Sequence, residues 1–301
     1  MLYLWSKGER HMSLRGKAAI VGYGEIPTRR VYPGRSAEGL AAEAFRLALE
    51  NSGLRREDID GIVTEGMAPG VGRAGYDPGV LAQYMGIVPT WGTGVSTGGA
   101  SGATALTIAS MAVDAGLANY ILVVFTSARD PSAPAPTGVP APNYGSEFEN
   151  PYGLAAGANT NFALMYQRHI YEYGTKTEQL AHHIVNQRFN ALENPNSAFQ
   201  GQPITIDDVL NSRVVNSPLH LLECVMPCAG ANALIVTTSD RAKALKNRPV
   251  YVLGAGYNTQ PMGSAQGGDS LTETAVKISA PRAFRMAGYN PHDMQFAQFY
   301  D

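Results

Sequence analysis

The chain has 301 residues, of which 45% are hydrophobic and 16% charged, and its formal net charge is −2. A chain of this length buries about 75% of its unfolded surface, as one large domain or two half-domains. The near-neutral charge excludes an electrostatic footprint for nucleic acid. Its apolar runs are far shorter than the ~20 residues that span a bilayer. Cysteines are present only as Cys224 and Cys228, which argues against a disulfide scaffold and favours a reducing, cytoplasmic location.

The first elements follow a leader, residues 1–16, which we expect to lie outside the fold. Residues 17–24, KAAIVGYG, form an apolar run that ends in glycine and predict a buried strand. Ser36 is placed to cap a helix with one apolar face, which Gly53 closes. Residues 59–64 then predict the next strand. The order strand, helix, strand is the first sign of an α/β fold.

The middle of the chain continues the alternation of helices and short strands. Further helices are expected near residues 80–85 and over 103–115, 162–173 and 177–192, and further strands at 119–125, 233–238 and 250–254. Residues 131–143 contain five prolines, which predicts a surface loop. Short strands between longer helices are typical of α/β proteins whose sheets are covered by helices.

The chain also resembles itself. VYVLGAGY at residues 250–257 matches AAIVGYG at residues 18–24, and the helical pattern of 270–288 matches that of 36–53. Three elements in the same order, the third being an acidic turn before a strand, favour an internal duplication.

The duplication predicts two related halves. We assign residues 17–247 to an N-terminal half with an inserted loop region, and residues 248–301 to the start of a C-terminal half. The first half continues past its acidic turn at Asp58, whereas the second ends soon after the matching Asp293. The remainder of the C-terminal half is therefore expected to be missing.

Five strings in chain order resemble the thiolase superfamily, in its lipid-transfer-protein branch of sterol-carrier-type thiolases and steroid side-chain aldolases. They are GKAAIVG at 16–22, GGASGAT at 98–104, GQPITIDD at 201–208, SPLHLLEC at 217–224 and FYD at 299–301. The resemblance implies a thiolase-like α/β fold. Its duplicated β-α-β-α halves would be layered as α/β/α/β/α, with the C-terminal half truncated here.

The glycine-rich stretch at residues 96–106, STGGASGATAL, reads as an elbow that leads into a helix of small residues. Thiolases carry a nucleophilic cysteine at this elbow, and the matching position here is Gly99, which cannot form an acyl-enzyme. The backbone N–H groups of Gly98 and Gly99 are expected to bind the thioester oxygen. Ser101 belongs to the same site and is expected to cap or pack, because no base accompanies it.

No metal or dinucleotide site is expected. Cys224 and Cys228 have only His220 near them in sequence, whereas zinc requires four donors. The glycines at 22 and 24 lack the third glycine of a dinucleotide fingerprint. The only cofactor that we expect is the coenzyme A of the substrate itself.

Tyr300 is the one side chain to which we assign catalysis. Sterol-carrier-type thiolases carry a histidine before the matching aspartate and the steroid aldolases a tyrosine, so FYD resembles the aldolase pattern. This implies retro-aldol cleavage of a 3-hydroxyacyl-CoA, with Tyr300 accepting the hydroxyl proton. Two alternatives stay open: a non-catalytic acyl-CoA or lipid-binding protein, and an acyltransferase with an unrecognised nucleophile.

The same resemblance implies partners. Members of the superfamily pair across a twofold axis, so a homodimer is expected. The aldolases act with an OB-fold, zinc-ribbon protein, and an equivalent partner is expected here.

Overall fold

The computed structural model describes residues 13–65, 77–128, 158–258 and 270–299. Its main element is a six-stranded sheet in the order β3-β2-β4-β7-β1-β8, and β5 and β6 form a small second sheet. The strands are β1 Ala18–Arg29, β2 Gly61–Glu65, β3 Trp91–Val95, β4 Tyr120–Ser127, β5 Val214–Asn216, β6 Leu219–His220, β7 Ala229–Thr238 and β8 Val250–Tyr251.

The helices alternate with these strands, as the sequence predicts. They are α1 Ala37–Ser52, α2 Pro78–Met85, α3 Ser101–Asp114, α5 Ala158–Tyr173, α6 Thr177–Glu193, α7 Ile206–Leu210, α8 Ser239–Ala242 and α9 Val276–Ala287. Short 3₁₀ turns occur at Arg56–Asp58, Leu221–Glu223 and Pro291–Asp293. None of the helices in the described ranges is long and apolar enough to cross a bilayer.

The main sheet is mixed. β2 is parallel to β3 and β4, whereas β7 is antiparallel to both β4 and β1. β1, β2, β3 and β4 therefore run in one direction, and their carboxyl ends lie along the same edge of the sheet. This edge is called the carboxyl edge below.

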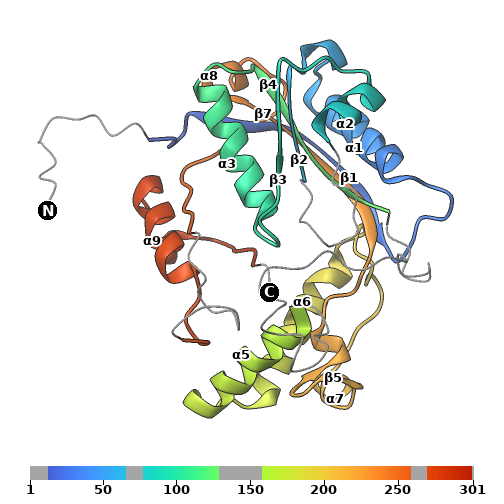
Figure 1. Cartoon of the computed structure of the whole chain (residues 1–301), viewed down its shortest axis with the longest axis vertical. Helices are drawn as coiled ribbons and strands as arrows, with labels where there is room; N and C mark the ends of the chain where they lie inside the picture. Colours follow the sequence, from blue (N-terminus) through green and yellow to red (C-terminus); the bar gives the residue numbers. More distant parts are fainter. Residues whose placement is uncertain (1–12, 66–76, 129–157, 259–269, 300–301) are drawn as a thin grey trace, which may run out of the picture.

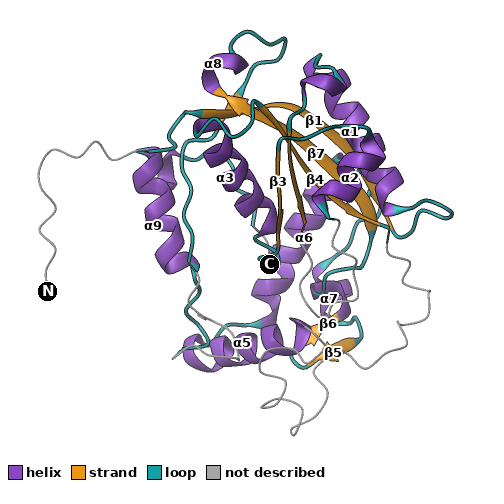
Figure 2. Ribbon diagram, turned by 45° about the horizontal axis from the view of Figure 1, so that its top comes forward, coloured by secondary structure: helices purple, strands orange, loops and turns teal. Residues whose placement is uncertain are grey.

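Helices cover both faces of the sheet, as Figures 1 and 2 show. One core cluster joins side chains of α1 and α2, such as Leu40 and Leu81, to strand side chains such as Ile62 and Ile235. The other joins α3 to side chains such as Val63 and Val123. The face packed by α3 is called the α3 face below. In both views α9 lies beyond α3, on the side away from α1.

The first helix begins and ends where the sequence predicts. The hydroxyl of Ser36 accepts a hydrogen bond from the N–H of Gly39 at 3.0 Å. Gly53 closes the helix with φ of 75°, a left-handed conformation that glycine adopts without the strain of a Cβ.

The duplication is visible in the geometry of the second half. Gly288 ends α9 with φ of 68°, as Gly53 ends α1, and the two glycines are 235 residues apart. The acidic turns match too, because Asp58 accepts the N–H of Arg55 at 2.8 Å and Asp293 accepts that of Asn290 at 2.7 Å. The second half thus repeats the helix end and the acidic turn of the first half.

Two strand predictions in the second half are wrong. The segment expected as a strand at 250–254 forms only the two-residue β8, which pairs with β1 at the sheet edge. Residues 294–299 follow the Asp293 turn but form no strand, and Phe296 and Phe299 are 83% and 77% exposed. A strand needs a neighbour to satisfy its backbone, and the described residues offer none to this segment.

Some expectations fall outside the described residues. These are the leader up to residue 12 and the proline-rich loop at 131–143. The domain boundaries at 17–247 and 248–301 stay a prediction. Of the five layers expected, the described residues contain the first sheet, its two helical layers and α9.

Candidate functional site

The elbow joins the end of β3 to the start of α3 at the carboxyl edge, and Figures 1 and 2 both show this connection. Gly98 has φ of 61°, a conformation that a Cβ would strain. Gly98, Gly99 and Ala100 are all exposed. The backbone at this bend also forms an isolated parallel bridge between Thr97 and Gly99. The predicted role of the Gly98 and Gly99 N–H groups in binding an oxyanion stays a prediction.

Ser101 has a structural explanation in the elbow. Its side chain is 4% exposed. Its hydroxyl donates to the carbonyl of Gly98 at 2.7 Å and accepts the N–H of Thr97 at 3.0 Å. Thr97 and Thr104 also share a hydrogen bond between their hydroxyls at 3.1 Å. The serine oxygen thus fixes the bend, and among described residues no base lies against it to activate it as a nucleophile.

Tyr300, the predicted catalytic residue, lies outside the described residues. Its position in the repeat is nonetheless informative, because Glu65 precedes Tyr300 by 235 residues, the spacing of Gly53 and Gly288. Glu65 is the last residue of β2, at the carboxyl edge and beside Val95 of β3. Tyr300 therefore matches a strand end of the first half.

The two cysteines both precede β7, are half-buried and form no disulfide with each other. The thiol of Cys224 donates to the carbonyl of His220 at 3.3 Å. Burial, and then the charge of Glu223, raise the pKa of Cys224 above its ordinary value. A raised pKa keeps the thiol protonated and disfavours a nucleophilic role.

The Nδ1 of His220, the histidine near this pair in sequence, hydrogen-bonds the carbonyl of Ser212 at 2.7 Å. Over the described ranges, no group of three or more histidine, cysteine, aspartate or glutamate side chains is placed to hold a metal ion.

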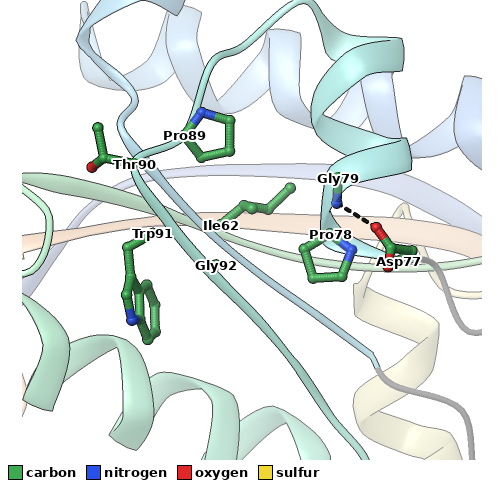
Figure 3. Close-up of a pocket in the computed structure, with 8 residues that line it drawn as sticks. All are labelled: Ile62, Asp77, Pro78, Gly79, Pro89, Thr90, Trp91 and Gly92. Atoms are coloured by element: carbon green, nitrogen blue, oxygen red, sulfur yellow. Dashed lines mark hydrogen bonds between the residues drawn. The ribbon is translucent and has the colours of Figure 1, made fainter.

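A shallow pocket of about 330 Å³ lies between β3 and the start of α2 (Figure 3). Asp77 caps α2 there by accepting the N–H of Gly79 at 2.7 Å. The hydroxyl of Thr90 donates a hydrogen bond to the backbone carbonyl of Asp60. The pocket's polar groups thus already serve the fold, and the pocket is apart from the elbow, so it does not mark the reacting centre.

Two polar side chains at the carboxyl edge escaped the sequence analysis. Glu25 of β1 and Asn232 of β7 are cross-strand partners. The signal was present in the alternation of β1, where Gly24 and Ile26 face α1 and Glu25 must face the other way. It was missed because the strand was predicted to end at Gly24.

Comparisons with known proteins agree with this fold. The acetyl-CoA acetyltransferase of Methanocaldococcus jannaschii is 30% identical, over 94% of this chain and 72% of its own length. The 17-hydroxy-3-oxo-4-pregnene-20-carboxyl-CoA lyase of Mycobacterium tuberculosis is 30% identical, over 96% of this chain and 76% of its own length. No family model matches the chain.

A solved structure is similar as well. The Ltp2–ChsH2(DUF35) aldolase superposes with a TM-score of 0.81 at 29% identity, over 93% of this chain and 72% of that one. The glycine elbow, the duplicated helix and turn, and these relatives point to one group of proteins. The chain belongs to the thiolase superfamily, in the branch of the sterol-carrier-type thiolases and the steroid side-chain aldolases.

Proposed function

We propose that this protein cleaves a carbon–carbon bond of a 3-hydroxyacyl-CoA by retro-aldol chemistry, without a covalent acyl-enzyme. The observation that carries the proposal is the 30% identity to a carboxyl-CoA lyase along 96% of the chain. Gly99 at the elbow supports it, because a glycine has no side chain to acylate.

The reaction begins at the 3-hydroxyl. A base removes its proton, the oxygen forms a carbonyl with Cβ, and the Cα–Cβ bond breaks. The electron pair passes to the thioester as an enolate, and Cα then takes a proton to give a shortened acyl-CoA. The products are this thioester and a ketone or aldehyde, so atoms and electrons balance.

Each predicted site residue has a role in these steps. The N–H groups of Gly98 and Gly99 hold the enolate oxygen, an interaction worth about 3 kcal/mol per donor. Ser101 keeps those N–H groups in place through its bonds to Thr97 and Gly98. Tyr300 accepts the hydroxyl proton, although the ordinary pKa of tyrosine near 10 requires help from its surroundings.

The test is to incubate the protein with a 3-hydroxyacyl-CoA and follow both products by mass spectrometry. Appearance of the shortened acyl-CoA together with the carbonyl product in equal amounts supports the lyase. Binding of the thioester without turnover favours the lipid-binding alternative. A covalent acyl adduct on the intact protein contradicts the proposal and supports the acyltransferase alternative, the activity of the M. jannaschii relative.

We also propose that the protein is a homodimer. Among the strands that the structure describes, β3 lies at an edge of the main sheet and pairs only with β2. The exposed side chains of Val80, Tyr84 and Val88 lie on or just after α2 next to it. An open edge beside apolar side chains suits pairing with a second copy. Sedimentation at micromolar concentration should give twice the monomer mass, and a monomer alone contradicts this.

An OB-fold, zinc-ribbon protein is the further partner that we propose. It is supported by the name of the similar aldolase structure, which joins Ltp2 to ChsH2(DUF35). Co-expression with such a protein should give a complex that elutes together in gel filtration. We place both proteins in the cytoplasm, in keeping with two cysteines that form no disulfide with each other.

A further inference from the structure

A row of side chains crosses the sheet at the carboxyl edge. Glu25 of β1 faces Asn232 of β7, and Asn232 faces Phe125 of β4. One residue beyond the pairing of Thr64 with Val124, Glu65 of β2 lies beside Phe125. Since paired residues point to the same face of a sheet, these four side chains share one face.

That face is the α3 face. Phe125 packs against the core cluster of α3, whereas Gly24 and Ile26, which flank Glu25, face α1. The buried core of the α3 face is apolar, with Ala18 and Val236 among its side chains. A glutamate and an asparagine opposite each other on two central strands interrupt it, and this pair is called the Glu25–Asn232 pair below.

The pair is partly organised already. Asn196, which follows α6, donates its side-chain N–H to the Glu25 carboxylate at 2.9 Å, and its own carbonyl accepts the N–H of Thr28 at 2.8 Å. One carboxylate oxygen of Glu25 thereby accepts a hydrogen bond from Asn196, and the other accepts none from the residues that the structure describes. Asn232 is exposed, and its amide bonds to nothing among the residues that the structure describes. A carboxylate oxygen and an amide N–H thus face the same space.

A hydroxyl group matches this arrangement. It is both donor and acceptor, so it can donate to the Glu25 carboxylate and accept from the Asn232 amide. The hydrogen bond to the carboxylate is charge-assisted and therefore among the stronger kinds. Ligands of open α/β sheets bind outside the carboxyl ends of the strands, which is where the pair lies.

The distance from the elbow decides which hydroxyl this is. The elbow follows β3, and β7 and β1 are the third and fourth strands from β3. With neighbouring strands about 4.8 Å apart, the pair lies roughly 14–19 Å across the sheet from the end of β3, where the elbow begins. A thioester held at that end of β3 has its reacting 3-hydroxyl only two carbons away, well short of the pair. The pair therefore suits a polar group at the remote end of the acyl chain. Phe125, on the same face, would then contact the apolar carbons between that group and the thioester.

We propose that Glu25 and Asn232 form a subsite that selects acyl thioesters with a hydroxyl far from the thioester carbon. The proposal rests on the proposed function, because it takes the thioester to bind at the elbow. It assigns these two residues to substrate selection and leaves the bond cleavage to the elbow and Tyr300.

The test is a binding comparison that needs no turnover. ω-Hydroxyacyl-CoAs of eight to sixteen carbons and their unsubstituted counterparts are titrated against the protein by calorimetry. We expect the hydroxylated member to bind about tenfold or more tightly at the best chain length. Asn232→Ala and Glu25→Gln should bring that ratio close to one and leave the affinity for the unsubstituted thioester unchanged. The glutamine can still accept from Asn196, so the fold is retained.

Tyr23→Phe is the matched control. Tyr23 precedes Glu25 by two residues on the same face of β1 and is 61% exposed, so its variant also removes one polar group from this face. The ratio should stay at its wild-type value. Equal affinities for both thioesters in the wild-type protein, or a ratio that survives both site variants, overturns the subsite alone. Failure to bind any thioester overturns the proposed function as well.

Discussion

Gly24 and Gly256 occupy equivalent positions against equivalent helices. A Cβ built on Gly24 would lie 2.0 Å from the carbonyl oxygen of Ala44 in α1, and one built on Gly256 would lie 1.9 Å from that of Ser279 in α9. Each glycine lets an extended segment approach the backbone of the helix that follows it. The two halves thus repeat a packing contact as well as a sequence pattern.

Replacing these glycines should destabilise the protein through that contact. Gly24→Ala places a methyl group where backbone atoms cannot move aside, and we expect a loss of about 1–3 kcal/mol or more in the free energy of unfolding. Gly256→Ala should lower stability in the same way, and urea denaturation followed by circular dichroism measures both.

Gly102→Ala supplies the control, because a Cβ on Gly102 in α3 would meet no atom within 4 Å. An alanine there should leave stability unchanged or raise it by up to about 1 kcal/mol, as expected for a helix. Equal stability of Gly24→Ala and Gly102→Ala would contradict the close approach of β1 and α1.

The sequence predicted the first half better than the second for a physical reason. Ser36 and Gly53 bound α1 through local hydrogen bonds, which local sequence encodes. β3 was not recognised, because Gly92 and Gly94 weaken a strand pattern and its existence depends on pairing with β2. β8 and residues 294–299 depend likewise on neighbours distant in the chain. Local sequence therefore could not predict that one strand is short and the other does not form.

One part of the candidate site could likewise be predicted from local sequence, and another part could not. The glycines of the elbow were visible in sequence because their conformational freedom is a property of the residue type. The outward face of Glu25 could be inferred from the alternation of β1, but its pairing with Asn232 could not, because the two residues are 207 positions apart and meet only through strand register.

Ser101→Ala should weaken the elbow without removing a nucleophile. The substitution leaves the N–H of Thr97 without its partner, which costs about 1–3 kcal/mol in a partly buried setting. The carbonyl of Gly98 loses the serine hydroxyl but still accepts the backbone N–H of residue 101 at 3.0 Å. Thr107→Ala, which removes an exposed hydroxyl from the same helix, should change stability by no more than about 0.5 kcal/mol. Thermal and urea unfolding compare the two.

A mass measurement completes this test. Wild-type protein incubated with acyl-CoA should gain no covalent acyl group, whether on Ser101 or on a cysteine. An adduct that disappears in Ser101→Ala would show that this serine is the nucleophile after all.

Cys224 should alkylate slowly near neutral pH. Burial, reinforced by the charge of Glu223, raises the pKa of its thiol, so the reactive thiolate forms only at a pH above the ordinary value near 8.5. The rate of its modification by iodoacetamide, followed by peptide mass spectrometry, should lag behind that of free cysteine at pH 7.5 and approach it at higher pH. A rate at pH 7.5 above that of free cysteine would reveal an activated thiol and would favour an acyltransferase.

Tyr300→Phe tests the assignment of the reacting base. The phenylalanine keeps the ring and its packing but removes the hydroxyl, so a purely structural tyrosine predicts normal turnover. A proton-transfer role predicts that turnover of a 3-hydroxyacyl-CoA falls by about 10²-fold or more, while the melting temperature stays close to that of the wild type. The assay is run on the protein together with the zinc-ribbon protein proposed as its partner, and product formation is followed by mass spectrometry.

Phe299→Leu at the neighbouring position is the control for this variant. Phe299 is 77% exposed and is the other aromatic side chain of FYD, so its change disturbs the same segment without touching a titratable group. It should retain most of the wild-type turnover. If Tyr300→Phe folds and turns over as fast as Phe299→Leu, the phenol does not accept the hydroxyl proton. A carboxylate at the same edge, such as Glu65, then becomes the base to examine, since it holds the matching strand end in the first half.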